Sequence, residues 1–143
     1  MTDFRRLSDS VMASPQIAPG DIQAAKNEGV GLIVNNRPDG EDPSAPQGAD
    51  IEAAAREAGL GYRAIPIDHS GFGDQQIDAM ATALEEAQGS VLAYCRSGTR
   101  STFLWALARA KAGDDPHALA EAAREAGYDI GPILPQLARL ADR

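Results

Sequence analysis

Cysteine, histidine and aromatic residues are all scarce in this chain of 143 residues. It contains one cysteine, Cys95, and two histidines, His69 and His117, and aromatic residues make up 5% of the sequence. A single cysteine excludes an internal disulfide and any mechanism that needs a second, resolving cysteine in the same chain. One cysteine and two histidines are also too few for a zinc-ligand cluster, so we expect neither a metal nor a cofactor.

Basic residues and long apolar runs are scarce as well. The chain has 13 Lys and Arg against 21 Asp and Glu, which gives a formal net charge of −8. Such a balance disfavours nucleic acids and anionic membranes as partners, because both bind basic surfaces. No apolar run reaches the 18 residues of a membrane span. With no disulfide to maintain, we expect a reducing compartment and a cytoplasmic location.

Strand patterns and helix patterns alternate along the sequence. Strands are expected in a hairpin over 4–13 and at 30–34, 62–67 and 91–94, and helices at 19–27, 51–58, 75–88, 101–112, 115–126 and 132–142. Pro66 places its strand at an edge or makes it end there. The alternation predicts one domain over 1–143, a three-layer α/β fold with a mostly parallel sheet and helices on both faces.

The strongest signal surrounds the cysteine. An apolar run at 90–94 leads into Cys95, which is followed by Arg96, Ser97, Gly98, Thr99, Arg100 and Ser101 before the pattern becomes helical. A short loop between a buried strand and a helix start directs its backbone N–H groups at one point and so binds anions. A thiol there is favoured as thiolate, and Arg100 offers a planar fork for an oxyanion. The alternative is an inert, buried strand-end cysteine.

Loops at 35–47, 68–74 and 95–101 each follow a predicted strand. Because ligands bind outside the carboxyl ends of parallel strands, we expect these loops to surround the cysteine. Arg37 then either reaches the substrate anion or pairs with nearby acids. Asp68 is either a catalytic acid or the start of an Asx turn.

Three motifs carry a family resemblance: Val-Met-Ala-Ser-Pro-Gln at 11–16, Val-Asn-Asn-Arg-Pro-Asp-Gly-Glu at 34–41 and Ala-Tyr-Cys-Arg-Ser-Gly-Thr-Arg-Ser at 93–101. Through them the chain resembles the phosphatase-like domain of the beta-lactamase-hydrolase-like family. That family is related to the dual-specificity tyrosine phosphatases and is often described as a sulfurtransferase. The resemblance implies a dual-specificity phosphatase-like fold.

The length of the cysteine loop and the scaffold around it indicate different chemistries. Cysteine phosphatases typically have five residues between cysteine and arginine, whereas here 96–99 make four. Four is typical of rhodanese-like sulfurtransferases, and a narrower loop suits a persulfide sulfur. However, two further helices and no strand follow the loop helix, as in phosphatases. We therefore predict a phosphatase-like fold that carries a loop of rhodanese length.

The first functional hypothesis is sulfur transfer. Cys95 would attack the outer sulfur of thiosulfate or of a persulfide and carry it as a cysteine persulfide. Arg96 and Arg100 would bind the anionic donor, with Arg37 as a further candidate, and the N–H groups of Ser97, Gly98 and Thr99 would stabilise the persulfide. The resemblance also implies a separate persulfide-oxidising partner enzyme.

The alternative hypothesis is phosphate ester hydrolysis through a phosphocysteine. Arg100 would then hold the equatorial oxygens, Ser101 would assist departure of the Cys95 thiolate, and Asp68 would protonate the leaving group. His69 beside it remains a second candidate for that role. A further alternative is an anion-binding module without catalysis, although binding alone needs no thiol.

Overall fold

A computed structural model describes residues 2–142, and it contains a five-stranded sheet with strand order β1-β2-β5-β3-β4. β1 (Arg5–Ser8) pairs antiparallel with β2 (Val11–Ser14), as the predicted hairpin requires. β3 (Val30–Asn35), β4 (Gly61–Ala64) and β5 (Ser90–Tyr94) join β2 in parallel. The order places β5, which leads into the cysteine, at the centre of the sheet.

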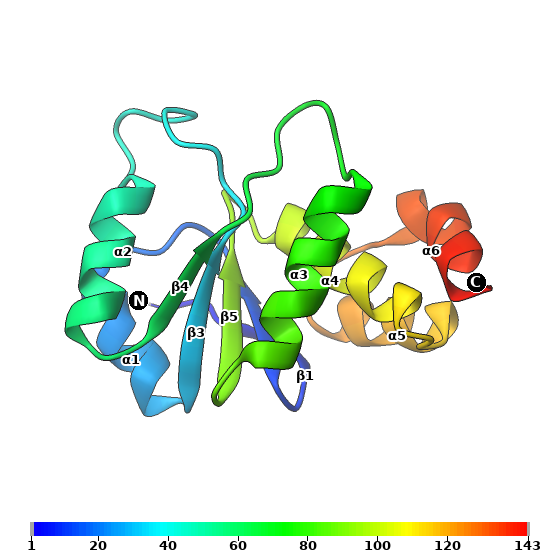
Figure 1. Cartoon of the computed structure of the whole chain (residues 1–143), viewed down its shortest axis with the longest axis horizontal. Helices are drawn as coiled ribbons and strands as arrows, with labels where there is room; N and C mark the ends of the chain where they lie inside the picture. Colours follow the sequence, from blue (N-terminus) through cyan, green and yellow to red (C-terminus); the bar gives the residue numbers. More distant parts are fainter. Residues whose placement is uncertain (1, 143) are drawn as a thin grey trace.

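Helices cover both faces of this sheet, as Figure 1 shows. Their bounds are α1 (Ile22–Asn27), α2 (Gly48–Glu57), α3 (Asp74–Glu86), α4 (Thr99–Lys111), α5 (Pro116–Glu125) and α6 (Leu134–Ala141), with short 3-10 turns at Pro19–Asp21 and Gly131–Ile133. α1 and α2 lie on one side of the strands and α3 and α4 on the other, where α5 and α6 pack outside α4. The predicted three-layer fold is confirmed.

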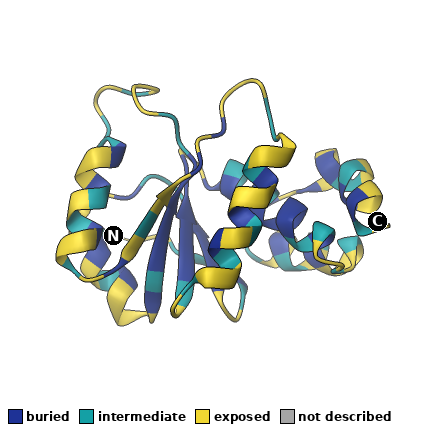
Figure 2. Ribbon diagram, in the orientation of Figure 1, coloured by how far each residue is buried: buried dark blue, intermediate teal, exposed yellow. Residues whose placement is uncertain are grey.

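The sheet separates two apolar cores, which appear as buried ribbon on either side of the strands in Figure 2. The smaller core joins α1 and α2 to the sheet through side chains such as Ile33, Ile51 and Tyr94. The larger core gathers Leu104, Trp105 and Leu137 with residues from α3, α5 and the other face of the sheet. α4, the helix that follows the cysteine loop, is buried along most of its length.

The edge strand is shorter than its apolar pattern predicts. β4 ends at Ala64 instead of residue 67, because its partner strand β3 ends at Asn35, which pairs with Ala64. The backbone nevertheless continues beside β3: Ile65 N–H donates to Asn35 O at 2.9 Å and Ile67 N–H donates to Asn36 O at 3.0 Å. This extension brings residue 68 to the same end of the sheet as the cysteine.

No helix within residues 2–142 combines the length and the apolarity that crossing a membrane requires.

We expect Leu104→Ala to destabilise the fold by about 2–5 kcal/mol, because it opens a cavity in the larger core. Leu104 is fully buried on α4, whereas Leu84 on α3 only borders the same core. Leu84→Ala is therefore the matched control and should cost clearly less. Urea unfolding followed by the fluorescence of Trp105, the one tryptophan of the chain, measures both; equal losses would contradict this packing.

Candidate active site

The cysteine loop joins the carboxyl end of β5 to the first turn of α4. Cys95 is fully buried at the floor of this loop, and its N–H donates to Ser14 O of the neighbouring strand at 3.3 Å. The Gly98 N–H turns back and donates to Cys95 Sγ at 3.1 Å. One backbone donor of the predicted cradle is therefore aimed at the sulfur.

Gly98 allows the loop to close in so few residues. It has a φ of 93°, in the left-handed region that favours glycine. Its carbonyl accepts from both the N–H and the hydroxyl of Thr102, at 3.0 and 2.8 Å. The Ser97 hydroxyl in turn accepts from the Thr99 N–H at 3.3 Å. The loop thus passes directly into a helix of 13 residues, whose positive end faces the sulfur.

Arg100 is held by an acid that lies far away in the sequence. Its Nη1 and Nη2 donate to the two carboxylate oxygens of Glu41 at 2.9 and 2.8 Å, and Nη1 also donates to Ile67 O at 2.9 Å. These bonds use three of the five N–H groups of the guanidinium. The remaining Nε and Nη2 N–H groups form a side-on fork, which is the arrangement that binds two oxygens of an oxyanion.

Charge pairing keeps both partners of this contact ionised. Hydrogen bonds from Arg100, and then those from Arg37, hold the pKa of Glu41 below its usual value. The Glu41 carboxylate raises the pKa of Arg100, and negative charge on the nearby Cys95 sulfur would add to that increase. Glu41 therefore acts as a fixed counter-charge that positions Arg100 beside the cysteine.

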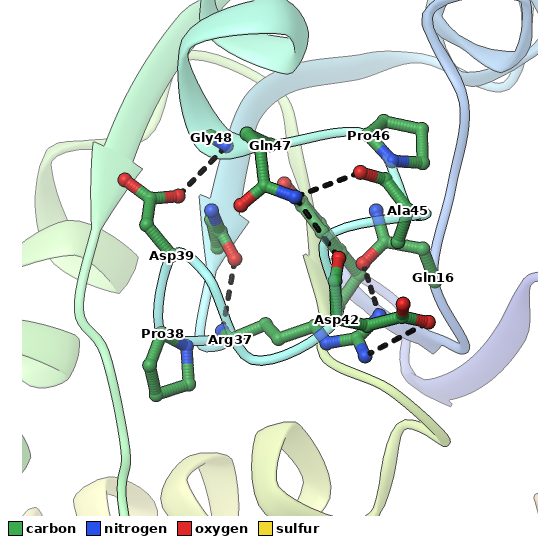
Figure 3. A pocket seen from close by; sticks show the side chains of 11 residues that line it. Gln16, Arg37, Pro38, Asp39, Asp42, Ala45, Pro46, Gln47 and Gly48 are labelled. Carbon is green, nitrogen blue, oxygen red and sulfur yellow. Dashed lines mark hydrogen bonds and ion pairs between the residues drawn. The ribbon is translucent and has the colours of Figure 1, made fainter.

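Arg37 lies behind Glu41. Its Nε donates to Glu41 at 2.8 Å and its Nη1 donates to the Gln16 side chain at 2.9 Å, while Asp42 lies at 3.8 Å. Figure 3 shows Arg37 between Gln16 and Asp42. The structure shows Arg37 paired with nearby acids, which is one of the two arrangements predicted for it. Through Glu41, the carboxylate that both arginines share, Arg37 is linked to Arg100.

Asp68 lies in the expected place but in a turn. The Ser70 N–H and hydroxyl donate to its Oδ1 at 2.8 and 2.5 Å, and they lower the pKa of Asp68. This is the Asx turn that the sequence offered as an alternative. The residue nevertheless lines an open cleft of about 520 Å³ together with Glu41, His69 and Arg100.

The remaining predicted site residues lie in and around the loop. Ser101 is fully buried on the first turn of α4, and its hydroxyl has no hydrogen-bond partner within the described part of the chain. Arg96 and Ser97 are exposed and Thr99 is half-buried. Two contributors were not predicted: Glu41 as the partner of Arg100, although it ends the motif at 34–41, and Gln16 as the anchor of Arg37.

Known proteins resemble this chain in sequence and in fold. A family model described as "Beta-lactamase hydrolase-like protein, phosphatase-like domain" matches residues 3–112. The chain belongs to this family. The resemblance drawn from the three motifs is thereby confirmed.

Two curated relatives carry the family's name. The beta-lactamase hydrolase-like protein of Xylella fastidiosa (strain Temecula1 / ATCC 700964) is 39% identical over 113 residues, which cover 76% of this chain and 26% of the relative. That of Agrobacterium fabrum is 35% identical over 104 residues, which cover 73% and 24%. The matched part of this chain thus corresponds to about a quarter of the length of these proteins.

Solved structures share the fold over almost the whole chain. A candidate phosphatase from Neisseria meningitidis is 28% identical, with a TM-score of 0.85 and coverage of 98% of this chain and 99% of that one. TpbA of P. aeruginosa in complex with phosphotyrosine is 18% identical, with a TM-score of 0.66 and coverage of 99% and 91%. The fold is therefore that of the cysteine-dependent phosphatases.

We expect Glu41→Gln to lower stability at neutral pH and to lose this effect in acid. The pKa of Glu41 is lowered from its ordinary value of 4.5. The ionised carboxylate therefore contributes its full stabilisation above that value and loses it as the pH falls through the lowered pKa. Urea midpoints of both proteins, measured across this range, should converge at the acid end.

Glu52→Gln is the control for the Glu41 variant. Glu52 pairs with the exposed Arg56 one turn further along α2, so its removal should change the urea midpoint little at any pH. A Glu41→Gln difference that persists unchanged in acid would show that the charge pair is not its cause.

Proposed function

We propose that this chain is a cysteine-dependent hydrolase of phosphate monoesters. The observation that carries the proposal is the Gly98 N–H donated to Cys95 Sγ at the start of α4, with the Arg100 guanidinium close to the same sulfur. A thiol in this position has both a donor for its negative charge and a binding site for a tetrahedral anion beside it. The phosphatase fold of the neighbouring structures supports the same chemistry.

In the first step of this reaction, Cys95 Sγ forms a bond to phosphorus while the bond from phosphorus to the ester oxygen breaks. Arg100 holds two equatorial oxygens, and a proton must reach the leaving oxygen. In the second step, water displaces the sulfur and releases phosphate. The buried hydroxyl of Ser101, which has no other partner in the described part of the chain, is available to donate to the departing thiolate.

The cleft beside Arg100 sets the kind of ester that fits. Its volume of about 520 Å³ lies in the range of small-molecule sites. Asp39, Glu41 and Asp68 give this cleft acidic walls, and Glu41 is already neutralised by its arginine partners. Acidic walls favour esters whose leaving group is uncharged or cationic, and disfavour polyanions such as nucleoside triphosphates.

Sulfane sulfur transfer is the second candidate, and two observations favour it. Four residues separate Cys95 from Arg100, and Asp68 is tied into a turn that keeps its carboxylate ionised. Sulfur transfer from thiosulfate needs no acid, because sulfite leaves readily as an anion. In this reaction Cys95 Sγ bonds to the outer sulfur, the bond between the two sulfurs breaks, and sulfite departs with the electron pair.

A paired turnover assay tests the two candidates. We expect the purified chain to hydrolyse p-nitrophenyl phosphate, and Cys95→Ser to abolish this because a serine hydroxyl is far less ionised than a thiol. The second arm follows thiosulfate-to-cyanide sulfur transfer with the same proteins. Sulfur transfer that needs Cys95, without phosphate release, would replace the first candidate by the second.

Asp68→Asn tests the proton donor, because asparagine keeps the Asx turn but cannot donate a proton as an acid does. If Asp68 protonates the leaving group, the loss should be small with p-nitrophenyl phosphate and on the order of 100-fold or more with an alkyl phosphate, whose leaving group is a strong base. Rates measured across a series of leaving groups reveal the difference. An equal loss with every ester would show that Asp68 is not the proton donor and leave His69 as the candidate acid.

A further inference from the structure

The peptide unit that joins Ser97 to Gly98 is held at both of its polar atoms. Its oxygen accepts a hydrogen bond from the Tyr128 hydroxyl at 3.1 Å, and its N–H donates to Cys95 Sγ at 3.1 Å. The residues described include no cis peptide bond, so the C=O and N–H of this unit point in opposite directions. Holding the oxygen outward therefore aims the N–H at the sulfur.

Tyr128 is itself fixed in place, in the segment between α5 and α6. Its side chain packs directly against the loop: a Cβ added to Gly98 would lie 2.1 Å from the phenol oxygen. The guanidinium carbon of Arg5 lies 5.1 Å from the centre of the Tyr128 ring, and Arg5 Nη1 donates to Ala126 O at 3.5 Å. Burial raises the pKa of Tyr128, so its hydroxyl remains a proton donor.

Gly98 makes such a support necessary. Without a Cβ it tolerates both signs of φ, so the peptide before it can rotate at little intrinsic cost. Rotation would replace the N–H beside the sulfur by a carbonyl oxygen. A carbonyl dipole in that position would repel both a thiolate and an incoming oxyanion, so one orientation is active and the other is not.

We propose that Tyr128 is a positioning residue that holds the Ser97–Gly98 peptide in the orientation that stabilises the Cys95 thiolate. The effect on turnover rests on the proposed function, whereas the effect on thiol reactivity does not. Tyr128 lies beyond the residues that the family model matches, so this support comes from a part of the chain outside the matched motif region.

Tyr128→Phe tests the proposal, because it removes the hydroxyl and keeps the ring against Gly98 and Arg5. Cys95 is the only cysteine, so iodoacetamide alkylation reports on this thiol alone. We expect the pH of half-maximal alkylation to rise and the rate at mildly acidic pH to fall about three- to tenfold, as for loss of one hydrogen bond. kcat should fall by a similar factor with KM little changed.

Tyr62→Phe is the matched control. Its hydroxyl accepts from Asn35 at 3.0 Å on the α2 side of the sheet, and its removal should leave the alkylation profile unchanged. Arg5→Met is a second variant, which keeps an apolar side chain over the Tyr128 ring but removes the positive charge. We expect it to raise the pH of half-maximal alkylation as Tyr128→Phe does, but by less.

The urea midpoint of each variant establishes that it is folded. A folded Tyr128→Phe protein with the parent alkylation profile would overturn the proposal. If that variant does not fold, a parent-like profile of Arg5→Met overturns it instead, and a shifted one supports it. Absence of phosphatase and sulfurtransferase turnover in the parent would refute the proposed function alone, because alkylation requires no substrate.

Discussion

A single backbone N–H that donates to a sulfur atom is the contact around which this chain is built. The bond from Gly98 to Cys95 Sγ requires a strand that stops at the cysteine, a residue with positive φ three positions later and a helix that begins at once. β5 meets the first requirement because it ends at Tyr94, directly before the cysteine. It is held there at the centre of the sheet, paired on both sides. α4 meets the last because it packs against α3, which precedes it in the chain, and against α5 and α6, which follow it.

Arginine side chains gather at this point in a chain that is otherwise acidic. Arg37 and Arg100 share one carboxylate, Glu41, and Asp42 lies 3.8 Å from Arg37, so these acids balance the two arginines in charge. What remains beside the cysteine is a set of directional N–H donors on Arg100, while the net charge of −8 disfavours the approach of anions in general. A small anion with few charges pays the least for that approach.

Sequence patterns were sufficient for the elements and for the loop, since hydrophobic periodicity and turn residues act locally. They were insufficient for contacts that the fold alone creates. Glu41 and Arg100 are 59 residues apart, and nothing local distinguishes Glu41 from its acidic neighbours. The two alternatives for Asp68 differ in whether its carboxylate turns to accept from the N–H and hydroxyl of Ser70, which is a matter of side-chain rotation. The edge position of β4, by contrast, was indicated by Pro66.

The larger core has a consequence for where this unit can be divided. The motif region of the family ends at residue 112, just after α4. Yet Leu119, Ile130 and Leu137, from the segments that follow, belong to the same apolar cluster as Leu104 and Trp105. A chain cut at the end of the motif region would retain every strand and the cysteine, but it would expose the outer face of α4 to water. The smallest piece able to fold is therefore longer than its recognisable signature.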